Sequence, residues 1–349
     1  MINLRSPLNF LGYGQVGLGI LKSLVLEHQQ QVCYFPIGQI ECDPKYHELI
    51  KESIANQEIF DCDAPNLTIW HQNLLETRIG RSTNAAISFF ELDRLNDREI
   101  RNINNHDIFI SASSWASNIV KNSCSCNVKV VPMGVDSSFF QPLAINIEKP
   151  YRFLNVGKIE IRKGHDILHE LFNRAFTKED DVELYISWDN PFLDENDKKR
   201  WIDLYKNTEL GDKIHFIPRV QDLRREYISA DCGIFPQRAE AICLPALEMM
   251  SCNKPIIITN YSGPTEFCNK DNSYLVNIEQ LETAVDGKWF QGEGKWAQIG
   301  TNQEAQFIEY MRNCYKNRIN TNPAGRLTAE KLDWKNVTKS ILEVLNGNN

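Results

Sequence analysis

The chain has 349 residues, of which 42% are hydrophobic and 24% are charged, and its formal net charge is −8. At roughly 100–200 residues per domain this length suggests two domains, and the composition is ordinary for a soluble globular protein. The acidic balance argues against a nucleic-acid partner, because the neutralisation of phosphates requires a basic surface.

The N-terminal segment and the cysteines exclude further classes. The N-terminal segment has no basic stretch followed by a clean apolar run, so we expect neither a signal peptide nor a membrane span. The ten cysteines are irregularly spaced, and the closest pair, Cys124 and Cys126, does not have the usual spacing of a zinc site. We therefore expect reduced structural thiols and a cytoplasmic location. An acidic chain without a basic amphipathic helix is expected to make at most weak peripheral contact with a membrane.

Short β-rich runs alternate with helical patterns, which predicts βαβ units and parallel sheets. In the first half we expect six strands, at Ile2–Leu4, Gln31–Phe35, Leu67–Trp70, Ala86–Phe90, Asp107–Ser111 and Val128–Val131. In the second half we expect six more, at Arg152–Val156, Val182–Ser187, Ile214–Ile217, Cys232–Phe235, Pro255–Thr259 and Ser273–Val276. Helices are expected at Val16–Glu27, Trp115–Asn122, Gly164–Phe176, Asp194–Asn207, Leu223–Ser229 and Pro245–Ser251. The two sets predict two Rossmann-like halves.

The boundary between these halves is expected near Gln141–Pro150, a segment with two prolines and little periodicity. The C-terminal tail differs from both halves. A helix is expected at Gln303–Arg318, followed by a loop and by one amphipathic helix at Thr328–Leu345. Trp334 lies on the apolar side of this last helix, which predicts a docking face.

The segment from Pro236 to Glu266 is the most informative part of the chain. Glu240 and Glu248 stand eight positions apart, with Pro245 between them. Because proline is favoured at the first positions of a helix, we expect a helix to begin at about Leu244 or Pro245. Glu240 then lies in the preceding loop and Glu248 in the first turn, beside free N–H groups that favour an anion. Two carboxylates beside a phosphate-binding helix end suit a nucleotide-sugar pocket.

Charged residues follow two strands of the second half. Lys158 and Lys163 follow the strand Arg152–Val156, where such a pair can hold a diphosphate as point charges. The alternative is a solvated loop, but ligands bind at the carboxyl ends of strands in open α/β sheets. Arg219 and Val220 follow another strand, where they suit contacts to phosphate and to a base, and a structural role stays open.

The glycine run Gly12–Gly17 matches the dinucleotide-binding pattern GxGxxG, but the match is weak. Charged and polar residues and Pro7 interrupt the approach to it, so we expect the glycines in a long loop after a short first strand. The preferred interpretation is a loop that closes over a phosphate or a sugar. A nicotinamide site and a plain tight turn are the alternatives. His71 and Glu91 also follow strands, and a site role competes with a structural one for both.

These motifs together resemble the retaining glycosyltransferases of family 4, which have the GT-B fold. The resemblance covers nearly the whole chain and is strongest, in order, at Gly12–Gly17, Val131–Asp136, Val156–Gly164 and Glu240–Glu248. It implies an α/β protein with two Rossmann-like domains that face a central cleft. Residues 1–145 would bind the acceptor and residues 146–327 the nucleotide sugar. Residues 328–349 would form a helix that crosses back to the first domain.

The resemblance also implies roles for single residues. Glu240 would hydrogen-bond sugar hydroxyls and help to hold the anomeric carbon, and Glu248 would bind the ribose. Lys158 and Lys163 would bind the donor diphosphate. The backbone of Ile242, Cys243 and Leu244 would cap the phosphates or the sugar.

In the first domain, Gly14 would let the acceptor and the distal phosphate come close. The sequence departs from the family at three positions. Ala241 and Cys243 replace glycines of the usual EGFGLP, and we expect ordinary backbone angles for both. The histidine that is common in the first domain is absent, and Glu91 stands near its place as a candidate catalytic acid.

The implied activity is the transfer of a sugar from a nucleoside diphosphate, most simply UDP or GDP, to an acceptor hydroxyl of a glycan or glycoconjugate. Fixed cations and helix N–H groups would stabilise the leaving diphosphate without a metal, and no cofactor is required. The alternatives are an NAD-dependent oxidoreductase, a GT-B epimerase or phosphorylase, and a sugar-binding protein without catalysis. The sequence leaves monomer and homodimer open.

Overall fold

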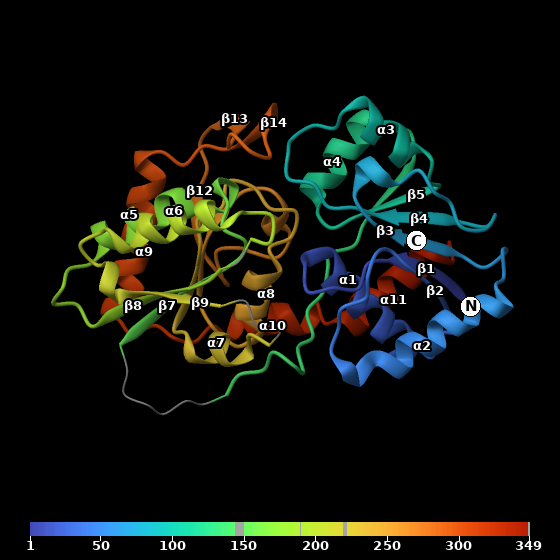
Figure 1. The fold of residues 1–349 in the computed structure, drawn as a ribbon, viewed down its shortest axis with the longest axis horizontal. Helices are drawn as coiled ribbons and strands as arrows, with labels where there is room; N and C mark the ends of the chain where they lie inside the picture. Colours follow the sequence, from blue (N-terminus) through green and yellow to red (C-terminus); the bar gives the residue numbers. More distant parts are fainter. Residues whose placement is uncertain (144–149, 189, 219–221, 348–349) are drawn as a thin grey trace. The chain divides into compact units, whose positions relative to one another are not determined.

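The structure is a computed structural model, which describes residues 1–143, 150–188, 190–218 and 222–347. The chain forms two compact units, Met1–Asp136 with Lys331–Asn349, and Ser137–Glu330. Figure 1 shows a sheet flanked by helices in each unit. The predicted functional boundaries after residues 145 and 327 stay predictions, and the first of them lies outside the described residues.

The first unit is built on a parallel sheet of six strands in the order β2-β1-β3-β4-β5-β6. The strands are β1 (Ile2–Ser6), β2 (Val32–Pro36), β3 (Asn66–Ile69), β4 (Asn84–Ile87), β5 (Ile108–Ser111) and β6 (Asn127–Val130). The helices are α1 (Gly12–Lys22), α2 (His47–Ala55), α3 (Asp97–Asn104) and α4 (Ser114–Ser123). All six strands were expected from their apolar runs, whereas the mostly polar α2 and α3 were not.

The glycine run lies in a helix and not in a loop. β1 continues to Ser6 and α1 begins at Gly12, so the predicted long loop is wrong. A Cβ on Gly14 would lie 2.2 Å from the backbone nitrogen of Asn9. Glycine is therefore required because the first turn of α1 packs directly on the preceding backbone.

The single helix predicted at Thr328–Leu345 is two helices, α10 (Pro323–Lys331) and α11 (Trp334–Leu345). The chain leaves the helical path between them, where the backbone N–H of Val135 donates to the carbonyl of Leu332 at 2.9 Å. α11 belongs to the first unit. Its Trp334 ring packs against Gly19 of α1, where a Cβ would lie 2.3 Å from the indole. The predicted docking face of Trp334 is confirmed.

The second unit has a parallel sheet of six strands in the order β12-β11-β10-β7-β8-β9. The strands are β7 (Tyr151–Val156), β8 (Val182–Ser187), β9 (Ile214–Ile217), β10 (Cys232–Phe235), β11 (Ile256–Asn260) and β12 (Tyr274–Asn277). The helices before α10 are α5 (His165–Ala175), α6 (Glu195–Lys206), α7 (Arg224–Ser229), α8 (Leu244–Ser251) and α9 (Thr301–Lys316). Buried side chains of α5 and α9, including Phe172, Phe307 and Met311, pack with the sheet in one core.

An antiparallel hairpin, β13 (Leu281–Val285) and β14 (Gln291–Ala297), follows β12. It was not expected, because β14 contains two glycines and three charged or amide side chains in place of an apolar alternation. Trp296 of β14 is buried and joins the two strands, because its Nε1–H donates to Oε1 of Glu282 in β13 at 3.0 Å.

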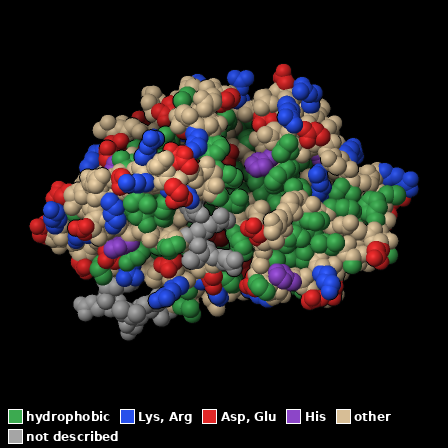
Figure 2. Space-filling model, in the orientation of Figure 1, with side chains coloured by type: hydrophobic (Ala, Val, Ile, Leu, Met, Phe, Trp, Pro, Cys, Tyr) green, Lys and Arg blue, Asp and Glu red, His purple; other side chains and the backbone are tan. Residues whose placement is uncertain are grey.

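The surface and the cysteines agree with the composition. Figure 2 shows acidic and basic side chains interspersed over the visible face, without the basic surface that a nucleic-acid partner requires there. All ten cysteines are free thiols, and Cys33, Cys232 and Cys252 are buried as predicted. In the described part of the chain, no helix is long and apolar enough to cross a membrane.

Candidate active site

The candidate site of the second unit lies where the strand order of its sheet changes direction. From β7 the chain continues through β8 to β9 on one side, whereas β10, β11 and β12 follow on the other. Ligands of open α/β sheets bind outside the carboxyl ends of strands at such a point. Lys158 follows the end of β7, and Glu240 follows the end of β10, its neighbour in the sheet.

Glu240 is buried and contacts two cations. Its Oε1 lies 2.9 Å from Nη1 of Arg162 and also forms an ion pair with Nζ of Lys163. Burial raises the pKa of Glu240, but the charges of Arg162 and Lys163 outweigh it and hold the pKa below its usual value. This carboxylate is therefore ionised and fixed in place. The structure brings Lys163 and Glu240 together, as the sequence motifs require.

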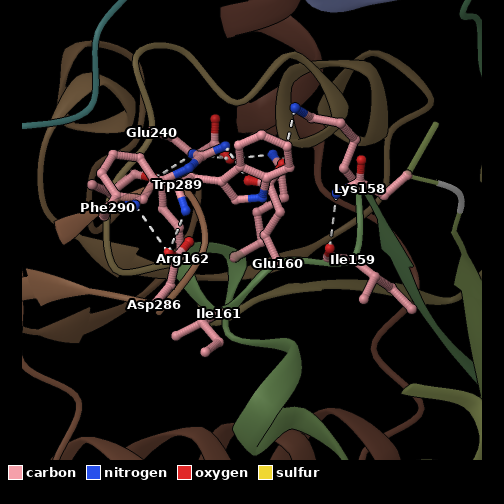
Figure 3. A network of polar contacts seen from close by, with 12 residues as sticks. Lys158, Ile159, Glu160, Ile161, Arg162, Glu240, Asp286, Trp289 and Phe290 are labelled. Atoms are coloured by element: carbon pink, nitrogen blue, oxygen red, sulfur yellow. Dashed lines mark hydrogen bonds and ion pairs between the residues drawn. The ribbon is translucent and has the colours of Figure 1, made fainter. Parts of the chain in front are cut away.

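A second buried carboxylate, Glu160, connects Lys158 to Arg162 (Figure 3). Its Oε1 lies 2.9 Å from Nζ of Lys158 and its Oε2 lies 2.9 Å from Nη2 of Arg162. Arg162 also donates from Nη1 to the carbonyl of Ala239 at 2.8 Å. Burial raises the pKa of Glu160, but Arg162 and the two lysines outweigh it and lower the pKa to about 2. A chain of ion pairs thus links Lys158 to Glu240.

The backbone around Glu240 is held by the Gly263–Glu266 segment. The N–H of Glu240 donates to Oγ of Ser262 at 3.0 Å, and its carbonyl accepts from the N–H of Gly263 at 2.9 Å. A Cβ on Gly263 would lie 1.9 Å from the carbonyl oxygen of Ala241, so only glycine permits this approach. The segment that follows β11 therefore supports Glu240 directly.

Cys243 departs from the sequence expectation. Its φ is +63° and its ψ is +62°, a left-handed conformation, so the ordinary backbone angles predicted for it are wrong. The positive φ is compatible with the glycine that the family has at this position. The prediction holds for Ala241, which is not among the residues with positive φ. Burial raises the pKa of the Cys243 thiol to about 12, so the thiol stays protonated.

α8 begins at Leu244 with Pro245 in its first turn, as predicted. Ile242 and Cys243 are buried and Leu244 is half-buried. A ligand at this segment would therefore contact its backbone more than its side chains. Cys243, the N-cap residue, gives no side-chain hydrogen bond to the first turn. The N–H groups of an uncapped first turn favour an anion.

Glu248 lies one position beyond the first turn of α8, and not within it as predicted. Its Oε2 accepts a hydrogen bond from the Tyr227 hydroxyl at 2.5 Å. Burial raises the pKa of Glu248 to about 7, and the hydrogen bond from Tyr227 opposes this effect. Glu248 therefore lies close to its titration point at neutral pH, in contrast to Glu240.

Two exposed aromatic rings lie beside Lys158. Phe192 is 52% exposed, and Nζ of Lys158 lies 5.2 Å from its ring centroid. Trp289, at the tip of the β13–β14 hairpin, is 46% exposed and meets Phe192 edge-to-face at 5.8 Å between centroids. Oδ1 of Asp286 accepts from the N–H groups of residues 288, 289 and 290 and so fixes the tip.

In the first unit, the candidate residues gather around Tyr13. Its hydroxyl accepts from the N–H of Phe89 at 2.8 Å and lies 3.2 Å from Oγ of Ser88. The exposed His71 packs on the Tyr13 ring at 4.4 Å between centroids. The half-buried Glu91 follows β4, as Ser88 and Phe89 do. Its charge raises the pKa of Tyr13, although burial is the main cause of the raised pKa.

Gly14 follows Tyr13 in the first turn of α1, at the carboxyl edge of the same sheet. Arg219 and Val220 lie outside the described residues. Sequence reasoning missed Tyr13, Glu160, Arg162 and Ser262. The signal for Glu160 and Arg162 was their place between the two candidate lysines; nothing in the sequence indicated that both are buried.

Part of the chain resembles a known family and curated proteins. Residues 139–288 match the family model described as "Glycosyl transferases group 1". An uncharacterized glycosyltransferase of Haemophilus influenzae is 29% identical over 137 residues, which are 38% of this chain and 37% of that protein. A mannosylfructose-phosphate synthase of Agrobacterium fabrum is 24% identical over 151 residues, 39% of this chain and 33% of that protein. The chain thus matches about a third of the length of these curated relatives.

Solved structures match over the whole chain. A sucrose-phosphate synthase from Thermosynechococcus elongatus superposes with a TM-score of 0.71, at 15% identity, over 99% of this chain and 98% of that one. Anabaena HepE, solved in complex with UDP-glucose, gives 0.69 at 14% identity over 99% of both chains. These matches confirm the predicted α/β fold of two Rossmann-like domains.

Residues 139–288 thus resemble the glycosyltransferase group 1 family, and the solved structures share the fold of the chain. The Haemophilus influenzae relative is itself described as a glycosyltransferase, which is the class of enzyme that the sequence predicts for this chain. The oxidoreductase alternative is not favoured.

Proposed function

We propose that this protein is a retaining, metal-independent glycosyltransferase of family 4, which transfers a sugar from a nucleoside diphosphate to an acceptor hydroxyl. One observation carries the proposal: Glu240, buried and ionised, lies with Arg162, Lys163 and Lys158 at the switch point of the second sheet. A fixed carboxylate for sugar hydroxyls and fixed cations for a diphosphate are what this transfer requires.

In this proposal the second unit binds the donor. Lys158 and Lys163 contact the diphosphate, and the N–H groups at the start of α8 face its oxygens. Glu240 accepts hydrogen bonds from the sugar hydroxyls, and Glu248 contacts the ribose. The backbone of Ile242–Leu244 caps the phosphates or the sugar. Arg219 and Val220 keep their predicted roles toward phosphate and base. UDP and GDP are the favoured nucleotides, and Anabaena HepE is a structural neighbour solved with UDP-glucose.

The chemistry follows from charge. The bond from the anomeric carbon to the diphosphate oxygen breaks, and the leaving diphosphate gains negative charge that the lysines and the α8 N–H groups stabilise. The acceptor oxygen attacks the same face, and a donor phosphate oxygen takes its proton. The glycosylated acceptor is uncharged, and the protonated diphosphate remains an anion that the cations of the site stabilise. The anomeric configuration is retained.

In the first unit we assign the acceptor, a glycan or glycoconjugate hydroxyl, to the region of Tyr13, His71 and Glu91. Gly14 provides the close backbone approach there. Glu91 is the catalytic candidate of this unit. No cofactor is assigned, and the protein is assigned to the cytoplasm as a monomer or homodimer with at most weak membrane contact.

A donor screen tests the proposal. Thermal melting of the full chain with UDP-, GDP-, ADP- and dTDP-sugars should reveal one stabilising nucleotide, and NMR of the transfer product should show retained anomeric configuration. Turnover should survive EDTA. Stabilisation by NAD and by none of the nucleotide sugars would instead indicate the oxidoreductase. Phosphate-dependent release of sugar would indicate a phosphorylase.

A further inference from the structure

We propose that Glu160 is a built-in counter-anion of the donor site, which weakens diphosphate binding at Lys158 and, through Arg162, couples this lysine to Glu240. The inference rests on the proposed function, and it assigns a role to two residues that none of the sequence motifs explains. It is carried by the positions, exposures and charges of five side chains in the second unit.

Glu160 bridges two cations that differ in exposure. Its two oxygens lie 2.9 Å from Nζ of Lys158 and 2.9 Å from Nη2 of Arg162. The side chains of Glu160 and Arg162 are each 5% exposed, whereas that of Lys158 is 33% exposed. Lys158 therefore lies at the rim, where an anion from solvent can reach it. The Glu160 carboxylate lies behind it and already holds one of its N–H groups.

The charges of the cluster almost cancel. Lys158, Arg162 and Lys163 supply three positive charges, and Glu160 and Glu240 supply two negative charges, so the sum is +1. Without Glu160 the sum would be +2, which matches a diphosphate better. Because the carboxylate and the diphosphate repel each other across a poorly solvated site, Glu160 must weaken diphosphate binding. Its low pKa keeps this charge present throughout the neutral range.

Arg162 links Glu160 to Glu240, so a change at Glu160 can alter the position of Glu240. Its guanidinium binds Glu160 through Nη2, and Glu240 and the carbonyl of Ala239 through Nη1. A planar guanidinium cannot turn toward one partner without loosening the others. When a diphosphate draws Lys158 away from Glu160, that carboxylate keeps its ion pair with Arg162. The occupancy of the diphosphate site and the position of Glu240 are thereby linked.

The consequence for turnover is faster release of product. Once the proton taken from the acceptor has passed from the phosphate oxygen to solvent, the nucleoside diphosphate carries more negative charge than the nucleotide sugar, so a nearby carboxylate repels the product more than the substrate. Glu160 acts as a positioning and tuning residue in this account. It touches neither sugar nor phosphate.

Calorimetry with UDP, GDP and inorganic pyrophosphate on the full-length protein tests the proposal. Glu160→Gln should bind the nucleoside diphosphate about tenfold more tightly than wild type, as expected for the loss of one close like charge. Its turnover should fall and show a burst followed by slow product release. In a Lys158→Met background the same substitution should tighten binding by a smaller factor, because Glu160 then no longer competes with the diphosphate for Lys158 and acts by repulsion alone. The control Glu279→Gln, an exposed carboxylate of the same unit, should change nothing.

Unchanged or weaker binding by a folded Glu160→Gln protein would overturn the proposal, and so would equal tightening in the Lys158→Met background. If Glu160→Gln does not fold, Glu160→Asp serves instead. The shorter carboxylate keeps its charge beside Arg162 but withdraws from Lys158, so affinity should rise by a smaller factor. Absence of any binding by wild type to all three probes would contradict the proposed function itself, which separates the two failures.

Discussion

Glu240 precedes the start of α8 and Glu248 lies within it, and their surroundings shift the two pKa values in opposite directions. Arg162 and Lys163 hold the pKa of Glu240 below its usual value despite burial. Around Glu248, burial prevails and raises the pKa to about 7, with Tyr227 as a hydrogen-bond donor. The residue type is the same, so the neighbouring charges decide which acid is permanently ionised and which one titrates near neutral pH.

This difference suits two different ligands. A permanently ionised carboxylate accepts hydrogen bonds from sugar hydroxyls and favours positive charge that develops at the anomeric carbon. A carboxyl group near its titration point can accept from or donate to a ribose hydroxyl. Substitutions of the two acids and of their neighbours separate these roles.

Glu240→Gln should have the largest effect. The amide keeps the size of the side chain but removes the charge that faces Arg162 and Lys163, so turnover should fall on the order of 10²–10³-fold. The affinity for the nucleoside diphosphate, measured by calorimetry, should not fall, because the substitution removes a negative charge from the cluster and no contact to the nucleotide. The same substitution at the exposed Glu279 is the control. A Glu240→Gln enzyme with near wild-type turnover would contradict the role of Glu240.

Arg162→Met should make Glu240 resemble Glu248. Loss of the guanidinium leaves two buried carboxylates without their shared partner, and the free energy of unfolding should fall by roughly 3 kcal/mol. The acid limb of the pH profile of turnover should move to higher pH, because the pKa of Glu240 rises. Arg162→Lys keeps the charge and should restore part of both losses. An acid limb that stays in place in Arg162→Met would show that Arg162 does not set the ionisation of Glu240.

Glu248 should make stability depend on pH. Its folded pKa lies above that of the unfolded chain, so the stability that protonation supports is complete below the unfolded value of about 4.5 and is lost as the pH rises through about 7. Between pH 6 and pH 8.5 the melting temperature of wild type should therefore fall relative to that of Glu248→Gln. Parallel curves for the two proteins would refute the raised pKa.

Tyr227→Phe sharpens this measurement. The Tyr227 hydrogen bond lowers the pKa of Glu248, so its removal should move the loss of stability to higher pH. Calorimetric affinity for the nucleoside diphosphate should show the matching trend if the ribose prefers the ionised form of Glu248: it should increase with pH, with a midpoint near 7 in wild type and a higher one in Tyr227→Phe. A pH-independent affinity would separate Glu248 from ribose binding.

Cys243, between the two acids, should give the smallest effect. Both Cys243→Gly and Cys243→Ala remove the thiol, but only glycine adopts a φ of +63° without strain. Cys243→Gly should therefore be more stable than Cys243→Ala by about 1 kcal/mol in urea unfolding. Equal stabilities would mean that the left-handed backbone is not strained.

Strands and motif positions could be predicted from the sequence, because apolar runs and strand ends leave local signals. All twelve predicted strands are present, and Lys163 and Glu240, which follow neighbouring strands, form an ion pair. The left-handed Cys243 could not be predicted, because a cysteine carries no local signal for a positive φ, and the close packing of Gly263 on the neighbouring Ala241 is a contact between distant segments.

The same limit applies to the other misses. The polar residues and Pro7 before the glycines indicated a long loop, whereas the glycines lie in α1 and Gly14 packs on the backbone of Asn9. Glu160 and Arg162 looked like solvated charges, since burial of an ion pair depends on partners from distant strands. The charged and glycine-containing strand β14 of the hairpin carries no apolar alternation that would mark it as a strand.

The docking of α11 has a consequence for how this protein is made. Ser23 donates to the carbonyl of Trp334, 311 positions later, and the Trp334 ring packs on Gly19. During synthesis the first unit therefore cannot be completed until the whole second unit has been translated, because α11 follows it in the chain. Such a large sequence separation slows folding and leaves an apolar surface on the nascent first unit exposed in the meantime.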